Sequence, residues 1–80
     1  MATTAEKRAA FRRLHESGCF VIPNPWDVGT VKYLQHLGFK ALATTSAGFA
    51  WSRGLADGGV TRDVMLAHIA ELSAAADVPM

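Results

Sequence analysis

Short apolar runs alternate with helix-forming stretches along this chain, and glycine or proline marks most of the junctions. Residues 19–22 (CFVI) form one run, which Pro23 and Pro25 end, and residues 39–44 (FKALAT) form a second run after a glycine. Continuous apolar runs of this length are typical of strands covered on both faces, and proline cannot donate to a sheet ladder. Their alternation with amphipathic helices predicts an α/β fold with a parallel sheet.

Three stretches have the periodicity and end signals of helices. They cover residues 4–17, 28–37 and 62–76, and each places apolar residues on one face. A side chain able to cap a helix precedes each stretch: Thr3, with Glu6 at capping-box spacing, then Asp27, then Thr61.

The chain has one cysteine and three histidines, and none of them suggests a metal site. Cys19 alone excludes an internal disulfide and a multi-cysteine zinc site, and we expect it to be a buried core thiol in a reduced, cytoplasmic protein. His15, His36 and His68 lack metal-ligand spacing and fall at helical positions, so we interpret them as helix-surface residues.

The charge pattern argues against nucleic-acid and membrane partners. The net charge is +1, and the basic residues near the N-terminus are best interpreted as a solvated helix face. The first residues lack the apolar core of a secretory signal, and no apolar run approaches the roughly 20 residues that cross a bilayer.

Eighty residues, half of them hydrophobic, are few for this fold pattern. Two parallel strands leave unpaired edges and uncovered faces, and a closed (β/α)₈ barrel takes about 250 residues. We therefore expect a fragment of a larger barrel, which would be inactive, poorly soluble or associating when expressed alone.

Polar residues follow each predicted strand, at the end where α/β enzymes keep their ligand sites. Trp26 and Asp27 follow the first strand; they could contact substrate, or serve only as a packing residue and a helix cap. The second strand leads into residues 43–48 (ATTSAG), whose small side chains, hydroxyls and free N–H groups could bind a carboxylate or phosphonate.

Asp57 lies in a glycine-flanked segment, residues 54–59 (GLADGG), within a long predicted loop from Thr45 to Val60. Such a segment could close over a substrate and bring a carboxylate to it. An ordinary surface turn would have the same composition, because Asp-Gly is common in turns.

Three segments together resemble one enzyme superfamily. Residues 20–27 (FVIPNPWD), 37–50 (LGFKALATTSAGFA) and 54–58 (GLADG) are similar, in order and spacing, to the isocitrate lyase/phosphoenolpyruvate mutase superfamily, above all its phosphonomutase-like and 2-methylisocitrate lyase-like members. The resemblance runs from about Ala10 to Met80.

This resemblance implies a particular place for the chain in a barrel. Residues 1–80 would be the N-terminal part of a single TIM-barrel domain, with a leading helix over 4–17. A first βα unit would cover 19–37, and a second would cover 39–76, including a gating loop over 49–60. The whole protein would be a homodimer or homotetramer.

The resemblance also implies a chemistry and a set of site residues. Thr45, Ser46 and Ala47 would hold the substrate carboxylate, although the turn is Thr-Ser-Ala where relatives have a Ser-Gly-Gly-like turn. Ala43 stands where relatives often carry an aromatic residue, which implies a wider pocket. Asp57 would be the acid of the gating loop, reaching the metal through water.

The implied cofactor is Mg²⁺, with Mn²⁺ as an alternative, and its main ligands would lie beyond Met80. The implied reaction is C–C bond cleavage in a small 2-oxo or 2-hydroxy carboxylate through an enolate-like intermediate. Two alternatives stay open: P–C bond mutase or hydrolase chemistry on a phosphonate, and a non-catalytic binding protein on the same fold.

Overall fold

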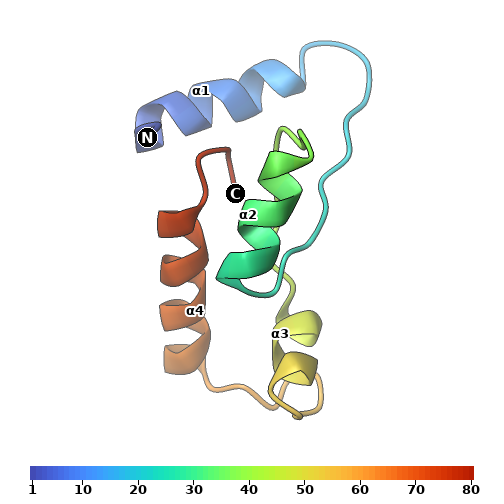
Figure 1. The fold of residues 1–80 in the computed structure, drawn as a ribbon, viewed down its shortest axis with the longest axis vertical. Coiled ribbons are helices and arrows are strands. Elements are labelled where there is room, and N and C mark those ends of the chain that lie inside the picture. The colour runs from blue at the N-terminus through green and yellow to red at the C-terminus, as the bar shows by residue number, and fades with distance from the viewer.

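A computed structural model describes all 80 residues, and its regular elements are four helices: α1 (Thr4–Leu14), α2 (Val28–His36), α3 (Ser46–Ser52) and α4 (Arg62–Ala75). Helices α2 and α4 lie side by side, α1 crosses their C-terminal ends, and α3 lies near the opposite end of the pair (Figure 1). None of the four is long and apolar enough to traverse a bilayer.

The predicted caps fix where these helices begin. The Thr3 hydroxyl accepts from the Glu6 backbone N–H at 3.1 Å, and the Glu6 carboxylate accepts from the Thr3 N–H, which completes the capping box. Asp27 caps α2 and Thr61 caps α4 in the same local manner. The three predicted helices are therefore confirmed, and their ends differ by one to three residues from expectation because helix ends fray.

The core lies between α2, α4 and the second extended segment. Val31, Leu42, Leu72 and Ala76 are almost completely buried and form one cluster. Half-buried apolar side chains pack around this cluster: Val28, Leu34, Phe39, Ala75 and Val78. One face of α2 and one face of α4 are thus covered, as the helical periodicity predicts, whereas α1 has no buried residue.

The strands expected over 19–22 and 39–44 are not formed, so the structure is all helical. Three extended segments are present instead, and one of them is joined to each of the other two by a single backbone hydrogen bond. These bonds run from Ala43 N–H to the Pro23 carbonyl (3.1 Å) and from Leu42 N–H to the Pro79 carbonyl (2.9 Å). Both acceptor residues are prolines and have no N–H with which to continue a ladder.

The arrangement of the extended segments nevertheless resembles the start of a parallel sheet. Leu42 and Ala43 donate to opposite sides, so segment 39–45 lies between segment 19–26 and segment 76–80. All three run in one direction, antiparallel to α2 and α4 (Figure 1). The order is the one expected of three consecutive parallel strands linked by helices.

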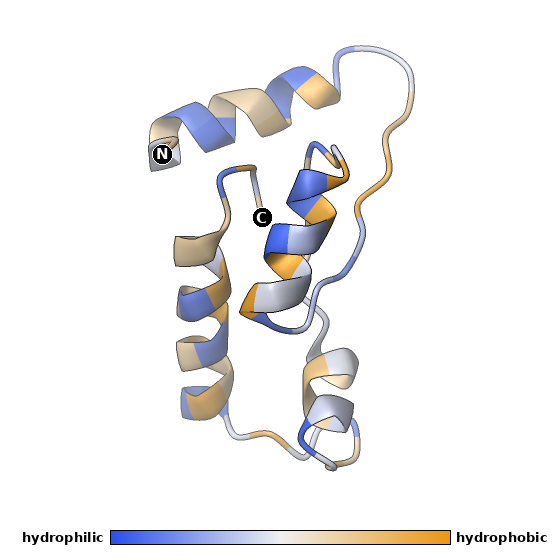
Figure 2. Cartoon of the chain, viewed as in Figure 1, coloured by the Kyte–Doolittle hydropathy of each residue, from blue (hydrophilic) through white to orange (hydrophobic).

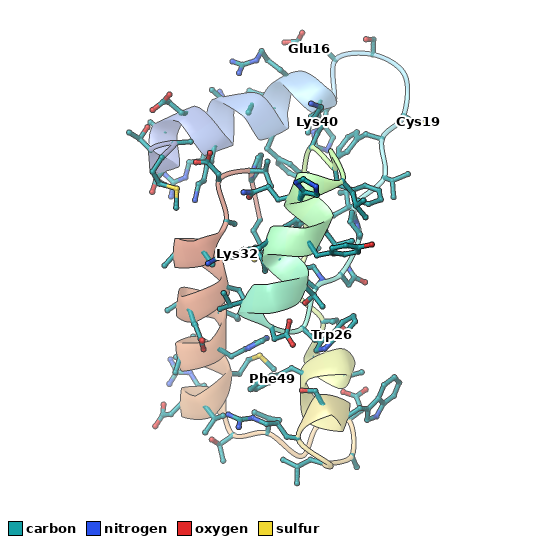
Figure 3. The ribbon with its side chains drawn as sticks, viewed as in Figure 1. Glu16, Cys19, Trp26, Lys32, Lys40 and Phe49 are labelled. Atoms are coloured by element: carbon teal, nitrogen blue, oxygen red, sulfur yellow. The ribbon has the colours of Figure 1, made fainter.

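Segment 19–26 is open on its outer side, although Pro25 within it is buried. Figure 2 shows it as an apolar stretch running outside the helices. Val21 is 66% exposed and Cys19 is also exposed, so the expectation of a buried core thiol is wrong. The thiol is exposed because no element covers the outer side of this segment, and Figure 3 shows Cys19 at its edge.

Candidate functional site

The turn expected to bind a carboxylate is the first turn of α3. Thr45 has an extended backbone (φ −132°, ψ 110°) and caps the helix, because its side-chain oxygen accepts from the Gly48 N–H at 3.0 Å. Residues 46–52 were expected to be loop, so the start of the gating loop predicted over 49–60 is corrected to helix. The remaining loop is residues 53–60.

Free backbone donors remain at the start of α3. The N–H groups of Ser46 and Ala47 have no acceptor in the chain, whereas those of Gly48 and Phe49 donate to Thr45. Ser46 is exposed, and its hydroxyl makes no hydrogen bond within the chain. The Thr45 hydroxyl accepts the cap bond and retains its own proton for donation.

Gly48 is held against the capping residue. A Cβ built on Gly48 would lie 2.7 Å from Thr45 Cγ2 and 3.1 Å from Thr45 Oγ1. The Thr45 side chain cannot rotate away without losing its bond to the Gly48 N–H. The first turn of α3 therefore requires glycine at this position.

Asp57 lies in a tight, hydrogen-bonded turn. The Gly59 N–H donates to the Ala56 carbonyl at 2.8 Å, and Gly58 has φ +84°, as the third residue of a type II turn requires. Asp57 is thus the second residue of this turn, and it is exposed. The surface-turn interpretation is correct for its local structure, while its role as a gate remains a prediction.

A second group of predicted site residues lies in a different cleft. Trp26 and Asp27 line an open cleft of about 360 Å³ together with residues of α3 and α4. The Asp27 carboxylate accepts from the Thr30 N–H and from the Thr30 hydroxyl, each at 2.7 Å, and these bonds lower its pKa. Asp27 therefore serves as the α2 cap, and the Trp26 ring is 44% exposed.

Three residues that the sequence did not indicate as site residues meet in this cleft. The Phe49 ring of α3 stacks on the His68 imidazole of α4, with centroids 3.6 Å apart and an interplanar angle of 13°. The Arg53 guanidinium carbon lies 5.3 Å from the Phe49 centroid. Figure 3 shows Phe49 between α3 and α4.

His68 is buried, with only 5% of its surface exposed, so its interpretation as a helix-surface residue is wrong. Burial lowers the pKa of the imidazole, and the charge of Arg53 acts in the same direction, whereas Glu71 and Asp27 oppose the shift. Its Nε2 atom is enclosed and has no hydrogen-bond partner. The stacking contact with Phe49 marks His68 in the structure, but the sequence gives no sign of this contact.

The predicted site residues are therefore not gathered in one place. No cavity of the chain is lined by Thr45, Ser46, Ala47 or Asp57. The largest cavities flank α1 and the loop; the one of about 390 Å³ beneath α1 is lined partly by Ala43.

The side chains of this chain do not fit a complete metal site. Nowhere do three of its His, Cys, Asp and Glu side chains come together in a way that could hold a metal ion. Asp57 is a single exposed carboxylate. It could at most add one outer contact to a metal held by other groups.

The geometry of the site does not by itself identify the class of protein, and comparison with known proteins supplies it. Residues 11–80 match the family model described as phosphoenolpyruvate phosphomutase. Two uncharacterized proteins of Mycobacterium tuberculosis, Rv1998c of strain H37Rv and MT2054 of strain CDC 1551, are each 41% identical over 66 residues, covering 80% of this chain and 26% of theirs.

Two solved structures from Burkholderia cenocepacia J2315 superpose closely. A protein provisionally named a lyase/mutase matches with a TM-score of 0.89 and 55% identity, covering 94% of this chain and 27% of that one. A protein provisionally named a phosphonomutase matches with a TM-score of 0.81 and 34% identity, covering 92% of this chain and 31% of that one.

These matches identify the family to which the chain belongs. The chain belongs to the phosphoenolpyruvate phosphomutase family, within the isocitrate lyase/phosphoenolpyruvate mutase superfamily, which confirms the resemblance drawn from its motifs. It spans 26% to 31% of the length of the relatives described above.

Proposed function

We propose that these 80 residues are the N-terminal portion of a Mg²⁺-dependent lyase that cleaves C–C bonds in small 2-oxo or 2-hydroxy carboxylates through an enolate-like intermediate. The parent would be a (β/α)₈ barrel. Family membership supports an enzymatic parent. The single observation that carries the proposal within this chain is the turn after the central extended segment, where two unpaired N–H groups and a free hydroxyl meet.

In this proposal the first turn of α3 holds the substrate carboxylate. The N–H groups of Ser46 and Ala47 and the Ser46 hydroxyl supply donors without breaking any bond of the chain. The Thr45 hydroxyl can add its proton while it still accepts from Gly48. Backbone donors fixed before substrate arrives need no reorganisation, which favours binding of an anion as charge develops on it.

Asp57 closes the site in the proposed mechanism. Its turn is attached to α3 by only three residues, and the glycines at 54 and 58 have positive φ, a backbone region open to few other residues. In this proposal the turn stays bonded to the C-terminal end of α3 and directs the carboxylate toward substrate held at Ser46. In this proposal Trp26 and Asp27 contact the substrate from the cleft that they line with residues of α3 and α4.

The main ligands of the metal would be groups that this chain does not contain. Mg²⁺, or Mn²⁺ in its place, would be held by carboxylates in the parent barrel, with Asp57 approaching only through water. These 80 residues form no metal site of their own.

A chimeric enzyme tests the proposal. Residues 1–80 would replace the matching segment of the Burkholderia lyase/mutase that is 55% identical, and Mg²⁺-dependent turnover of oxaloacetate and related 2-oxo and 2-hydroxy acids would be measured. We expect turnover that falls at least tenfold in Asp57→Ala, while Asp63→Ala, an exposed acid on α4, changes little. Equal turnover by the Asp57 variant would remove this residue from the mechanism.

P–C bond chemistry is the second candidate, because the matching family is described as a phosphomutase and one superposed structure is provisionally named a phosphonomutase. The same donors at Ser46 and Ala47 would suit a phosphonate as well as a carboxylate. Turnover of phosphonopyruvate by the chimera, without cleavage of C–C substrates, would favour it. Binding of both substrate classes without turnover would favour a non-catalytic binding protein.

A further inference from the structure

The contact between α3 and α4 rests on a small aromatic cluster, Phe49, Arg53 and His68. Phe49 and His68 are 6% and 5% exposed, and their rings are nearly parallel at 3.6 Å. Arg53 lies over the Phe49 ring and is also the residue at which α3 ends. The cluster therefore sits at the point where residues 53–60, the gating segment, leave the helix.

The chain beyond Arg53 is tied back to α3. The Gly54 N–H donates to the Trp51 carbonyl at 3.0 Å, and the Leu55 N–H donates to the Ala50 carbonyl at 2.9 Å. Together with φ +74° at Gly54, these bonds form a Schellman motif. Only Ala56 separates this motif from Asp57, so the position of the acid follows the position of the C-terminal end of α3.

Stacking, and not hydrogen bonding, holds the imidazole at position 68. Its enclosed Nε2 atom lacks a partner, which is unfavourable for a buried polar group, and a phenyl ring would fill the same space. The charged groups that face it are Asp27 of α2, Arg53 at the end of α3 and Glu71 of α4, and all three line the same cleft. The ring thus lies between α4 and the helix from whose end the gating segment begins.

We propose that Phe49 and His68 are positioning residues that anchor the gating segment: their stack holds the C-terminal end of α3 on α4 and thereby fixes where the Asp57 turn lies. The effect of this anchor on catalysis rests on the proposed function, in which Asp57 closes the site. The anchor itself is a property of this chain and can be tested without activity.

Amide hydrogen exchange of the 80-residue chain in dilute solution tests the anchor. The reporters are the Leu55 amide, whose bond closes the Schellman motif, and the Gly59 amide, whose bond closes the turn. The reference is the Leu37 amide, which donates to the Tyr33 carbonyl at the end of α2. Loss of an aromatic pair should speed exchange at the two reporters about three- to tenfold relative to the reference.

Three variants separate the anchor from general packing. Phe49→Leu and His68→Ala remove the stack and should accelerate the reporters, whereas His68→Phe keeps two stacked rings and should retain wild-type exchange. Equal acceleration at Leu37, Leu55 and Gly59 would place the pair in the general core and overturn the proposal. Acceleration in His68→Phe as large as in His68→Ala would overturn it as well.

The same variants in the chimeric enzyme distinguish this inference from the proposed function. If the chimera is active, His68→Ala should lower kcat more than it changes KM, and His68→Phe should restore kcat. A chimera without turnover would defeat the lyase proposal, while selective exchange at Leu55 and Gly59 would still support the anchor.

Discussion

The ammonium group of Lys7 donates a 2.6 Å hydrogen bond to the carbonyl oxygen of Ala76, 69 residues further along the chain. A second bond, of 3.3 Å, runs from the same nitrogen to the Ser73 carbonyl. Both acceptors lie at the C-terminal end of α4, where carbonyl groups lack helical partners and the helix dipole favours a cation. Lys7 thus fastens the leading helix to α4.

Replacing Lys7 by Met should destabilise the chain by about 1–2 kcal/mol, because the aliphatic stem stays while a charged hydrogen bond is lost. Urea unfolding followed by circular dichroism would measure the change. Arg8→Met is the matched control, since Arg8 is an exposed neighbour on α1 without a hydrogen bond to α4. An equal loss in both variants would show that helix propensity, and not the bond to Ala76, is responsible.

Gly48→Ala should destabilise the first turn of α3 by about 1–2 kcal/mol, because the new Cβ forces the Thr45 methyl out of the position its cap bond requires. The double variant Thr45→Ser/Gly48→Ala removes the methyl and keeps the hydroxyl. Its stability should exceed that of Gly48→Ala alone in thermal melts. If Thr45→Ser gives no recovery, the close approach is not what makes glycine necessary.

The helix caps were predictable because their signals are local. Thr3, Asp27 and Thr61 each bond a backbone N–H three residues ahead, so the short sequence around each position contains the whole interaction. Thr45 makes the same kind of bond. It was assigned to a loop because the helix it begins is only seven residues long and is rich in small residues.

The buried face of α4 departs from the apolar pattern at one position. The buried residues are His68, Leu72 and, at the cap, Ala76, whereas the apolar Ile69 beside His68 is 37% exposed. The difference comes from Phe49, which arrives from α3 and covers His68. A contact between residues 19 positions apart leaves no periodic signal in either helix.

Stability should fall as the solution is acidified below about pH 6.5, the ordinary pKa of histidine. The pKa of His68 is lowered in the folded chain by burial, so between its folded and unfolded pKa values the unfolded chain binds the proton more readily. The loss begins near pH 6.5 and stops growing below the folded pKa. In His68→Phe, this part of the pH dependence of the urea midpoint should disappear; its persistence would assign the titration to another group.

Variants of Asp27 distinguish its two interpretations, a helix cap and a contact with substrate. Asp27→Ala removes the α2 cap and should cost about 1 kcal/mol in thermal or urea unfolding, whereas Asp27→Asn keeps an acceptor oxygen for the Thr30 N–H and should cost less. In the chimeric enzyme, normal turnover by Asp27→Asn would agree with a purely structural cap. A large rise in KM in this variant, with stability preserved, would instead indicate contact with substrate.

The isolated chain should self-associate through segment 19–26. Val21 and Ile22 expose apolar side chains, and their N–H groups have no acceptor in the chain, so this segment presents an open edge. Sedimentation velocity should show species larger than a monomer as concentration rises, and Val21→Lys should shift the distribution toward monomer, because a charged residue blocks edge pairing. Tyr33→Lys, an equally exposed site on α2, is the control and should leave association unchanged. A wild-type chain that stays monomeric and unfolds sharply and cooperatively on heating would show that these 80 residues form a self-sufficient domain.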